Sequence, residues 1–419
     1  MVESLFSCLP LHWKVTTLGE SCKKGGGNIQ TGPFGSQLHA SDYVPFGIPS
    51  IMPQNIGDNR VLTEGIARIT SEDAARLSRY LVKKGDIVYS RRGDVERRAL
   101  IRTEEDGWLC GTGCLRVRFG NSEVDPLYAS YYLGHPSVRG WIVRHAVGAT
   151  MPNLNTSILS ALPFVIPPLP EQKAIAHILG TLDNKIELNR EMNQTLENIA
   201  WTIFNSWFQE NNFPENWQIL PLEECMAEII DYRGKTPKKT TSGIPLITAK
   251  IVKNGRINQP EEYIALEDYH SWMRRGFPES GDVVMTTEAP LGEIAQLDGR
   301  KVALAQRLIT LRGKPGILDN TYLKFLMQSS FVQDQLHARA TGTTVFGIRQ
   351  SELREVLLAI PPFPEQKAIA SVLRNLEDKI GANEKESLML AAIRDSLLPQ
   401  ILSGQIQVRD REIFVENSI

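Results

Sequence analysis

The chain has 419 residues, more than one ordinary hydrophobic core accommodates, so two or more domains are expected. Hydrophobic residues make up 42% and charged residues 22% of the composition, and no run approaches the roughly 18 apolar residues of a membrane span, which indicates a soluble globular protein. The five cysteines are scattered, and the first residues lack a basic segment followed by an apolar run. We therefore expect no disulfide framework, no secretory signal and a cytoplasmic location.

The net charge of −2 is unevenly spread along the chain. Lysines and arginines exceed aspartates and glutamates by 3 in residues 1–166, equal them in residues 212–360, and are 5 fewer in the remainder. A nucleic-acid footprint, if present, must therefore consist of local patches, because no single field of positive charge covers the whole protein.

Residues 1–166 are expected to form a first compact α/β domain. Short β-prone runs such as residues 86–90 and 114–119 alternate with turns, and residues 125–134 have a helical pattern. Polar loops between these runs are candidates for DNA contact, because asparagine and glutamine pair with adenine, arginine and lysine with guanine, and serine, threonine and lysine with phosphate. The alternative is an ordinary solvated surface, since surface loops are generally polar. The candidates in this region are Lys23, Lys24, Gln30, Thr31, Ser36, Gln37, Gln54, Asn55, Arg91 and Arg92.

Residues 167–210 are expected to form a long helix. Pro170 suits the first helical turn, and Glu171 suits the positive N-terminal end of the helix. From Ile175 to Trp207, apolar or seam residues recur in alternating steps of four and three, which is typical of a coiled-coil seam. Asn189 occupies a seam position near the middle, where a buried asparagine fixes the register of two helices. The alternative for Asn189 is a solvated position at the edge of the seam.

Residues 211–360 repeat the order of elements of the first region and are expected to form a second α/β domain. Gly243-Ile244-Pro245 matches Gly47-Ile48-Pro49, and Gly281-Asp282 matches Gly85-Asp86. The candidate strands are residues 282–286 and 307–311, and residues 321–337 look helical. The loop residues proposed for DNA contact are Arg233, Lys235, Thr236, Lys250, Arg307, Thr343 and Thr344.

Residues 361–408 are expected to form a second long helix, followed by a tail at 409–419. Residues 361–380 are identical to residues 167–186 at 13 of 20 positions, at an offset of 194. Asn383 is the counterpart of Asn189, and we expect Gly381 and Pro399 to weaken or kink this helix.

Each of these helices has an apolar seam that needs a partner, and the two matching helices are the natural partners. The predicted fold class is therefore α+β: two α/β domains in tandem, separated by two long antiparallel coiled-coil helices with pseudo-two-fold symmetry. In an antiparallel pair of equal helices the midpoints meet, so Asn189 and Asn383 are expected to approach each other.

Several catalytic motifs are missing from the sequence. There is no G-x-x-x-x-G-K-[ST] phosphate loop and no Asn/Asp-Pro-Pro-aromatic motif of the amino-methyltransferases. Cys110 and Cys114 lack partners with zinc-ligand spacing, so burial as small residues is favoured over a metal site. The E-x-K triplets at Glu171–Lys173 and Glu365–Lys367 resemble part of a nuclease metal site, but each opens a helix and follows no suitable strand and aspartate.

The two P-P-x-P-E-Q-K-A-I-A blocks, at residues 167–176 and 361–370, carry a resemblance to a known family. With the Pro-x-x-Trp openings at Pro10 and Pro214, the plan of the whole chain resembles the specificity subunits of type I restriction-modification systems. The resemblance implies two target-recognition domains, 1–166 and 211–360, that each read half of a bipartite DNA target. It also implies that the helices set the spacer between the half-sites and dock the modification subunits.

The same resemblance implies a chain that is not an enzyme and holds no cofactor or metal. Two adenine-methyltransferase subunits would use S-adenosylmethionine, and restriction subunits would use ATP and Mg²⁺. Two alternatives stay open: a modification-only or type IIB-like complex with the same architecture, and a metal-dependent nuclease that uses the E-x-K triplet. The DNA target cannot be derived from the sequence.

Overall fold

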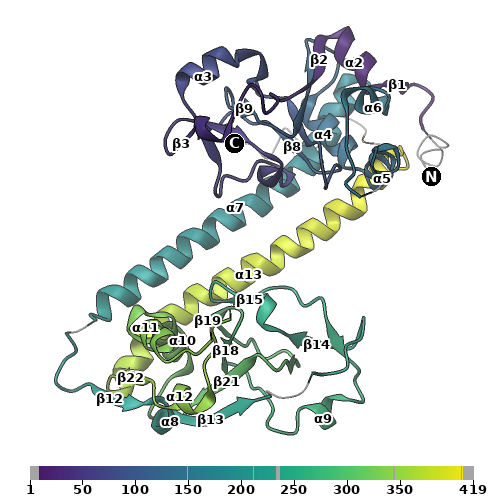
Figure 1. The fold of residues 1–419 in the computed structure, drawn as a ribbon. Coiled ribbons are helices and arrows are strands. Elements are labelled where there is room, and N and C mark those ends of the chain that lie inside the picture. The colour runs from purple at the N-terminus through teal and green to yellow at the C-terminus, as the bar shows by residue number, and fades with distance from the viewer. Residues whose placement is uncertain are drawn as a thin grey trace, which may run out of the picture. The chain divides into compact units, whose positions relative to one another are not determined.

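The computed structural model describes residues 9–148, 150–210, 212–232, 236–342, 345–406 and 408. The chain divides into two compact units, the first made of Met1–Asn189 and Lys385–Ile419 and the second of Arg190–Glu384. Each unit contains one α/β domain together with part of helix α7 (Leu169–Trp207) and part of helix α13 (Phe363–Leu402) (Figure 1). Within the described ranges, no helix combines the length and the apolar character that a membrane crossing requires.

The first domain is built on a five-stranded sheet in the order β2-β10-β7-β8-β5. A four-stranded sheet in the order β3-β6-β4-β9 and the pair β1-β11 complete its β-structure. The elements before α7 are β1 (Lys14–Thr17), α2 (Leu18–Lys24), β2 (Gly26–Thr31), η1 (Ala40–Asp42), β3 (Tyr43–Val44), β4 (Ile48–Ile51), η2 (Pro53–Asn55), β5 (Asp58–Asn59), β6 (Ala67–Ile69), α3 (Ser71–Arg76), η3 (Ser78–Tyr80), β7 (Ile87–Ser90), β8 (Arg98–Leu100), β9 (Leu109–Cys110), β10 (Cys114–Gly120), α4 (Pro126–Gly134), α5 (Pro136–His145), α6 (Thr156–Ser160) and β11 (Pro163–Ile166).

The second domain repeats this plan with a four-stranded sheet in the order β13-β21-β18-β19. The three-stranded sheet β17-β14-β20 and the pairs β12-β22 and β15-β16 accompany it. Its elements are β12 (Gln218–Pro221), α8 (Leu222–Cys225), β13 (Met226–Asp231), β14 (Ile244–Ile247), η4 (Ala249–Ile251), β15 (Val252–Lys253), β16 (Arg256–Ile257), β17 (Tyr263–Ile264), α9 (Tyr269–Trp272), β18 (Val283–Thr287), β19 (Leu291–Gln296), β20 (Ala303–Leu304), β21 (Leu308–Gly313), α10 (Asn320–Gln328), α11 (Ser330–Ala338), α12 (Gln350–Arg354) and β22 (Leu357–Ile360).

The four candidate strands of the sequence analysis correspond to β7, β10, β18 and β21. The expected helix 125–134 is α4, where the Asp125 side chain accepts a hydrogen bond from Tyr128 N and Pro126 stands in the first turn. The helical stretch expected over 321–337 is confirmed, as two consecutive helices. Ser329 has extended backbone angles (φ −66°, ψ 152°) and donates its hydroxyl to Leu326 O, so the segment breaks into α10 and α11.

The long helices complete the hydrophobic cores of both domains. In the first unit, Leu179 of α7 and Leu402 of α13 are fully buried in the same core as Tyr128 and Phe164. In the second unit, Phe204 of α7 and Leu373 of α13 are buried with the strands and α10. α13 is one continuous helix that runs through Gly381 and Pro399, because packing of this kind outweighs the weak helix propensity of the two residues.

Within each unit the segments of α7 and α13 are antiparallel. In the first unit, Asp183 of α7 pairs with Arg394 at 2.6 Å, and Asn189, two turns later, donates to Glu386 Oε2 at 2.8 Å. In the second unit, Asn383 donates to Asn193 Oδ1 at 2.8 Å. Asn189 and Asn383 are both buried, one in each unit, and their expected approach to each other stays a prediction.

The glutamines of the repeated block fasten each long helix to the domain that precedes it. Gln172 is fully buried and donates to Glu123 O and Pro167 O, while its carbonyl accepts the Asp125 N–H. Gln366 is also fully buried and makes the same three hydrogen bonds, two to Ile317 O and Pro361 O and one from Asp319 N. Since each amide replaces its bonds to water with bonds to domain backbone, it fixes where the helix starts relative to the sheet.

Candidate nucleic-acid interface

Strand direction brings several predicted loops of the first unit to one end of its sheet. Strand β10 is antiparallel to both β2 and β7, with Leu115 opposite Thr31 and Cys114 opposite Ser90. The loops after β2 and β7 therefore lie beside the loop before β10. The loop after β4 joins them, because Gly111 N donates to Ile51 O. We call residues 32–37, 52–55, 91–97 and 111–113 the first loop edge.

Close backbone approach at this edge explains one of its glycines. Gly32 N donates to Cys114 O at 2.9 Å, and a Cβ on Gly32 would lie 2.1 Å from the carbonyl oxygen of Gly111. Any larger residue at Gly32 would push the β2 loop away from the β10 loop. The loops of the edge are consequently held by backbone hydrogen bonds as well as by side chains.

The structure separates the first-region candidates into three groups. Ser36, Gln54 and Arg92 are exposed on the first loop edge, and Thr31 is half-buried next to it. Lys23 and Lys24 close α2 and precede β2, so they lie at the opposite end of β2 from Thr31, and Lys24 pairs there with Glu123. The structure thus does not bring these two lysines together with the other candidates.

Three candidate amides are occupied inside the first domain. Asn55 is buried and binds Met52 N and Leu62 O, and Gln37 Oε1 accepts from Phe34 N and Tyr80 Oη. Gln30 Oε1 accepts from Arg116 Nη2 at 2.8 Å. Each would have to exchange an internal hydrogen bond for one to DNA. Their contact with DNA stays a prediction.

A buried charged network toward the opposite end of β7 and β10 from the first loop edge escaped the sequence analysis. Arg118 pairs with the buried Asp86 at 2.5 Å, and Arg116 donates to Arg79 O and Leu81 O. Burial lowers the pKa of Arg116. The second domain repeats the pair as Arg312 and Asp282, at 2.8 Å. The signal that pointed to it was the repeated Gly-Asp, which places one aspartate before the central strand of each sheet.

Arg91, half-buried, and Arg92, exposed, lie in the turn of the first loop edge that follows β7. The Arg91 guanidinium lies over the Phe34 ring, 5.7 Å from its centroid, and Arg91 N donates to Gly113 O. Arg92 is exposed and forms a β-bridge with Asn153. This turn therefore presents two cations beside the aromatic ring of Phe34 from the neighbouring loop, and hydrogen bonds hold its backbone on both sides.

We expect the double variant Arg91→Ala, Arg92→Ala to bind its DNA target less tightly and with a weaker dependence on salt. Each lost phosphate contact lowers the slope of log K against log salt by about one. The measurement is the Kd for a target duplex over a series of salt concentrations. Arg68→Ala is the matched control, because Arg68 binds Gly47 O at the far end of β4. An unchanged slope in the double variant would exclude a phosphate role for the pair.

The second unit forms an equivalent edge. Strand β21 is antiparallel to β13 and β18, with Ile309 opposite Asp231 and Leu308 opposite Thr286. Ala305 N donates to Ile247 O, which adds the loop after β14. We call the described residues among 232–237, 248–250, 288–290 and 305–307 the second loop edge.

The second-region candidates at this edge have partners within the domain. Thr236 accepts a hydrogen bond from Gln306 Nε2 at 3.2 Å, and Arg307 pairs with Glu288 at 2.8 Å. The exposed Lys250 pairs with Glu261 at 3.1 Å. These exposed ion pairs are weak and can open for a phosphate. The remaining candidates, Arg233, Lys235, Thr343 and Thr344, lie outside the described residues.

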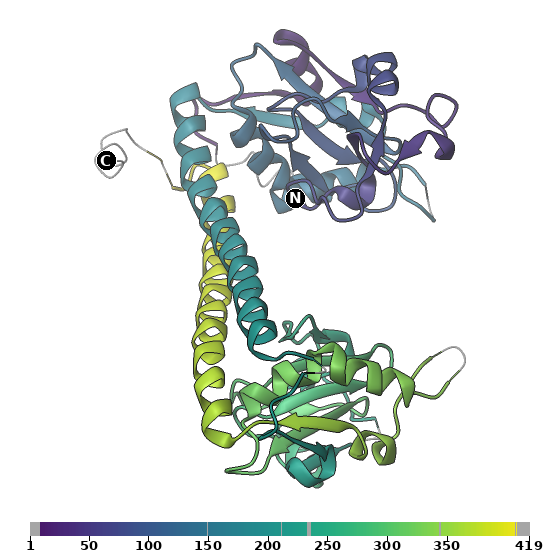
Figure 2. The same ribbon diagram turned by 90° about the vertical axis from the view of Figure 1, so that its left-hand side faces the viewer.

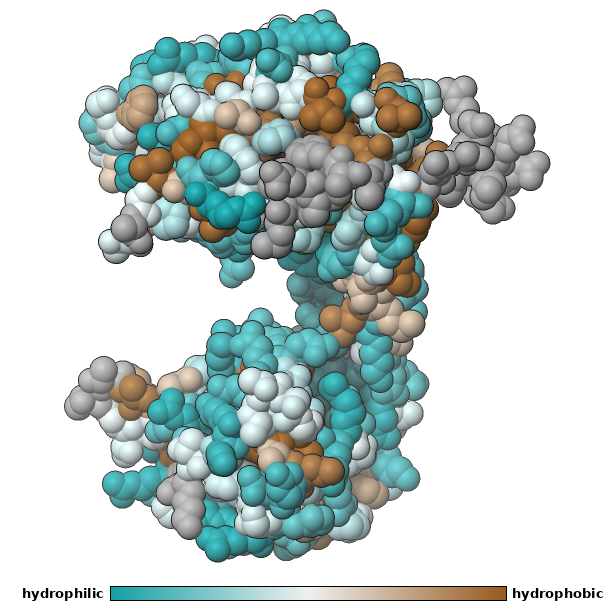
Figure 3. Space-filling model, turned by 90° about the vertical axis from the view of Figure 1, so that its right-hand side faces the viewer, coloured by the Kyte–Doolittle hydropathy of each residue, from teal (hydrophilic) through white to brown (hydrophobic). Residues whose placement is uncertain are grey.

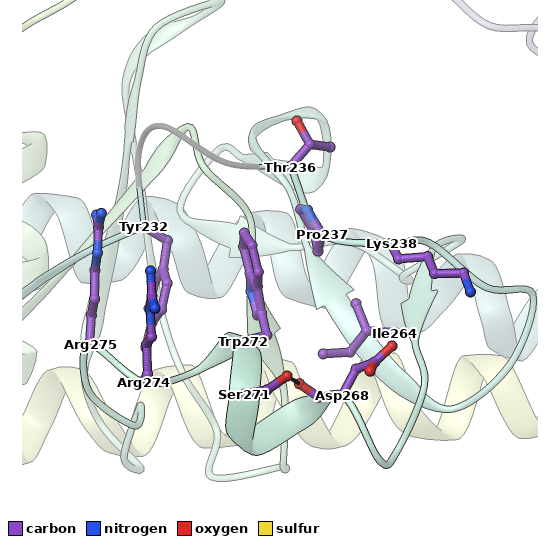
Figure 4. A pocket seen from close by; sticks show the side chains of 10 residues that line it. All are labelled: Tyr232, Thr236, Pro237, Lys238, Ile264, Asp268, Ser271, Trp272, Arg274 and Arg275. Atoms are coloured by element: carbon purple, nitrogen blue, oxygen red, sulfur yellow. Dashed lines mark hydrogen bonds between the residues drawn. The ribbon is translucent and has the colours of Figure 1, made fainter.

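A cavity of about 410 Å³ borders the second loop edge. Figure 4 shows the lining: Tyr232, Thr236, Pro237, Lys238, Ile264, Asp268, Ser271, Trp272, Arg274 and Arg275.

The cavity combines aromatic rings with cations. Tyr232 and Trp272 stack with their centroids 5.8 Å apart, and Trp272 Nε1 donates to Leu304 O. Lys238 and Arg274 are exposed at its rim. The same combination of ring and cation occurs on the first loop edge at Phe34 and Arg91, and it suits a nucleic-acid strand.

The family is decided by a comparison with known proteins. The family model described as the type I restriction modification DNA specificity domain matches residues 10–198 and again residues 214–390. The chain belongs to this family. The two matches cover one domain and the following long helix each, so the internal repeat is a repeat of this specificity domain.

Two curated relatives of this specificity subunit align with it over most of both chains. A putative type I restriction enzyme MjaX specificity subunit from Methanocaldococcus jannaschii is 23% identical over 396 residues, 87% of this chain and 88% of the relative. The MjaIX specificity subunit of the same organism is 21% identical over 432 residues, 96% and 95% of the two chains. A crystal structure of a type I restriction-modification S subunit from M. genitalium superposes with a TM-score of 0.57 at 17% identity, over 93% of this chain and 96% of that one.

The E-x-K triplets of this specificity subunit have structural partners. Glu171 accepts hydrogen bonds from Trp13 Nε1 at 2.9 Å and His12 Nε2 at 2.8 Å, and Glu365 accepts one from Asn216. The glutamates thus tie each long helix to the Pro-x-x-Trp turn of its domain. Among the described residues, no three histidine, cysteine or acidic side chains are grouped to hold a metal ion. Cys110 and Cys114 are buried, and burial raises the pKa of the Cys110 thiol to about 12.

Proposed function

We propose that this specificity subunit reads a bipartite DNA target, with the first loop edge on one half-site and the second loop edge on the other. The observation that carries the proposal is the repeat of one edge on two domains whose loop residues differ. Similar scaffolds with Arg91 and Gln54 on one edge and Arg307 and Thr236 on the other favour two different base sequences.

In this proposal the chain carries no catalytic group. It serves two modification subunits that methylate adenine with S-adenosylmethionine, and restriction subunits that use ATP and Mg²⁺. The long helices dock the modification subunits and set the spacer between the half-sites. Support comes from α7 and α13, which join the cores of both domains and would transmit their length to the distance between the edges.

A domain exchange tests the proposal. We expect replacement of residues 11–166 by the corresponding domain of another family member to change one half of the methylated motif and leave the other half intact. The measurement is methylome sequencing of the host with the native gene, with the hybrid gene and without either. A motif that changes in both halves would refute the modular assignment. A methylated motif that persists in the host without the gene would show that this chain does not specify that motif.

The second candidate is a modification-only or type IIB-like complex. A chain of this architecture would serve such a complex as well as one that contains restriction subunits. Sequencing of the neighbouring genes distinguishes them through the presence or absence of an ATP-driven restriction subunit.

The nuclease alternative predicts metal-dependent DNA cleavage by the purified chain alone. Since Glu171 and Glu365 are engaged by the Pro-x-x-Trp turns, we expect no such cleavage.

A further inference from the structure

One hairpin has the same construction in both domains. Residues 252–257 form the β15-β16 hairpin of the second domain, whose first and last residues pair. The first and last residues of the segment 56–61 pair in the same way in the first domain. An offset of 196 relates the two segments, the same offset that relates the Gly-Asp pairs before β7 and β18. We call the two segments the clasp hairpins. Arg60 and Arg256 occupy the same position in them.

Arg256 contacts both long helices of the second unit. Its Nε lies 2.9 Å from Glu197 Oε1 of α7, and its Nη1 and Nη2 lie 3.2 Å from Glu384 Oε1 and 3.9 Å from Glu377 Oε2 of α13. Figure 2 shows the α7 and α13 segments of this unit side by side. The buried Lys324 of α10 adds a second cation, 2.7 Å from Glu377 Oε2. One guanidinium thus joins the second domain to α7 and α13 at the same time.

The first unit makes the equivalent contact from the same hairpin. Arg60 pairs with Glu187 of α7. Asp58, two residues earlier, lies 3.7 Å from Arg394 of α13, and Arg394 also pairs with Asp183 of α7 at 2.6 Å. The clasp hairpin of each domain therefore reaches both long helices of its unit.

The contacts of Arg256 differ from those of the polar residues that cover the surface. On the face shown in Figure 3, hydrophilic residues predominate, and ion pairs at such exposed positions contribute little to stability. The Arg256 side chain is only 19% exposed, and the three carboxylates that it meets would repel one another without it. Because partly buried charges are screened less by water and salt, this network holds its geometry more firmly than an exposed pair does.

Each clasp hairpin adds a second point of attachment far from the first. Gln366 fastens the start of α13 to the second domain, and Glu377 and Glu384 lie 11 and 18 residues further on, about 16 and 27 Å along the helix. In the first unit Gln172 and Glu187 are 15 residues apart, or about 22 Å. A domain attached at one end only could swing across its helix, and the second attachment opposes that movement.

We infer that Arg60 and Arg256 are positioning residues that make the protein selective for one spacer length. The inference rests on the proposed function and goes beyond it, because it assigns spacer selectivity to the angle at which each domain meets its own helices. A fixed angle forces the DNA to bend or twist when the spacer is one base pair too long or too short, and that deformation weakens binding. A domain that can swing absorbs the difference itself, so the DNA keeps its shape.

The test compares the native protein with Arg256→Ala on three duplexes. The full-length chain is purified with the subunits that accompany it. The duplexes contain the motif defined by methylome sequencing, with its native spacer, one base pair fewer or one base pair more. The measurement is the Kd for each duplex. The native protein should prefer the native spacer, and Arg256→Ala should reduce that preference by about tenfold, because the domain then absorbs the mismatch in place of the DNA. Arg60→Ala should act in the same way from the first unit.

Further variants distinguish a positioning role from a general loss of stability. Arg312→Ala is the matched control, because Arg312 is 20% exposed and pairs with the buried Asp282 inside the same domain. It should lower the urea midpoint of the second unit and leave the spacer preference unchanged. Arg256→Lys keeps a charge near the carboxylates and should restore part of the preference. Glu197→Gln removes only the α7 carboxylate, should give a partial loss, and replaces Arg256→Ala if that variant does not fold.

The outcomes separate the inference from the function on which it rests. A folded Arg256→Ala or Glu197→Gln protein with the full native spacer preference overturns the positioning role. An equal loss of preference in Arg312→Ala overturns it as well, since the effect then follows stability alone. Native protein that binds the motif equally with all three spacers overturns the inference and leaves the reading of the half-sites standing. Native protein that does not distinguish the motif from unrelated DNA overturns the proposed function itself.

Discussion

Replacing Gln366 with alanine should lower the stability of the second unit by about 2–5 kcal/mol. The side chain is fully buried, and its loss leaves Ile317 O, Pro361 O and Asp319 N without the partner that they have in the native protein. Each unpaired buried group costs about 1–3 kcal/mol, and partial access of water to the new space reduces the total. The measurement is the urea midpoint together with hydrogen exchange, which assigns the loss to one unit.

Two variants sharpen this test. Gln366→Glu keeps the shape of the side chain but turns its two donors into acceptors that face two carbonyl oxygens, so it should destabilise at least as much as alanine. Lys367→Ala, at the exposed neighbouring position, should change stability by less than about 0.5 kcal/mol. Gln172→Ala should produce the same loss in the first unit. A Gln366→Ala protein as stable as the Lys367→Ala control would show that these hydrogen bonds do not hold the helix to the domain.

Inserting one heptad into α7 between Asn193 and Leu196 should lengthen the DNA spacer by about three base pairs. Seven residues preserve the phase of the seam and add about 10.5 Å at 1.5 Å per residue, and DNA rises about 3.4 Å per base pair. The increase is smaller if the unchanged α13 slides along its partner. Both half-site sequences should stay the same, because no residue of either loop edge is altered.

The measurement for the heptad variant is the methylated motif in the host. An insertion of four residues at the same place serves as the control, since it rotates the seam and should be tolerated less well. An active heptad variant with an unaltered spacer would show that these helices do not set the distance between the half-sites. An inactive variant that is folded would show that α13 cannot follow the extension.

The internal repeat and the apolar periodicity were sufficient to predict the long helices and several strands. The Pro-Pro-x-Pro-Glu-Gln-Lys blocks located the starts of α7 and α13 to within three residues of Leu169 and Phe363. The spacing of the seam residues predicted the approximate length of both helices, because the apolar stripe of a helix recurs every three to four residues along the sequence. The same holds for β7 and β18, whose short apolar runs follow the repeated Gly-Asp.

Interactions between distant residues were not visible in those signals. The segment 321–337 has a helical pattern throughout, yet it breaks at Ser329. Asn55 looked like a loop amide available for DNA, but Leu62 O and Met52 N occupy it in the interior. Burial of a polar side chain depends on which backbone groups the fold brings near it, and loop composition carries no information about that.

The sequence by itself determined that this protein is a duplicated pair of α/β domains with long helices, and its motifs were specific enough to indicate the family. Tertiary structure decided which candidate loops share a surface. Lys24 and Thr31 are seven residues apart but lie at opposite ends of β2, whereas Thr31, Arg91 and Gly113 meet at one edge. Strand order and direction arise from pairing between residues far apart in the chain, so they govern the position of every loop while leaving little trace in the residues of the loop itself.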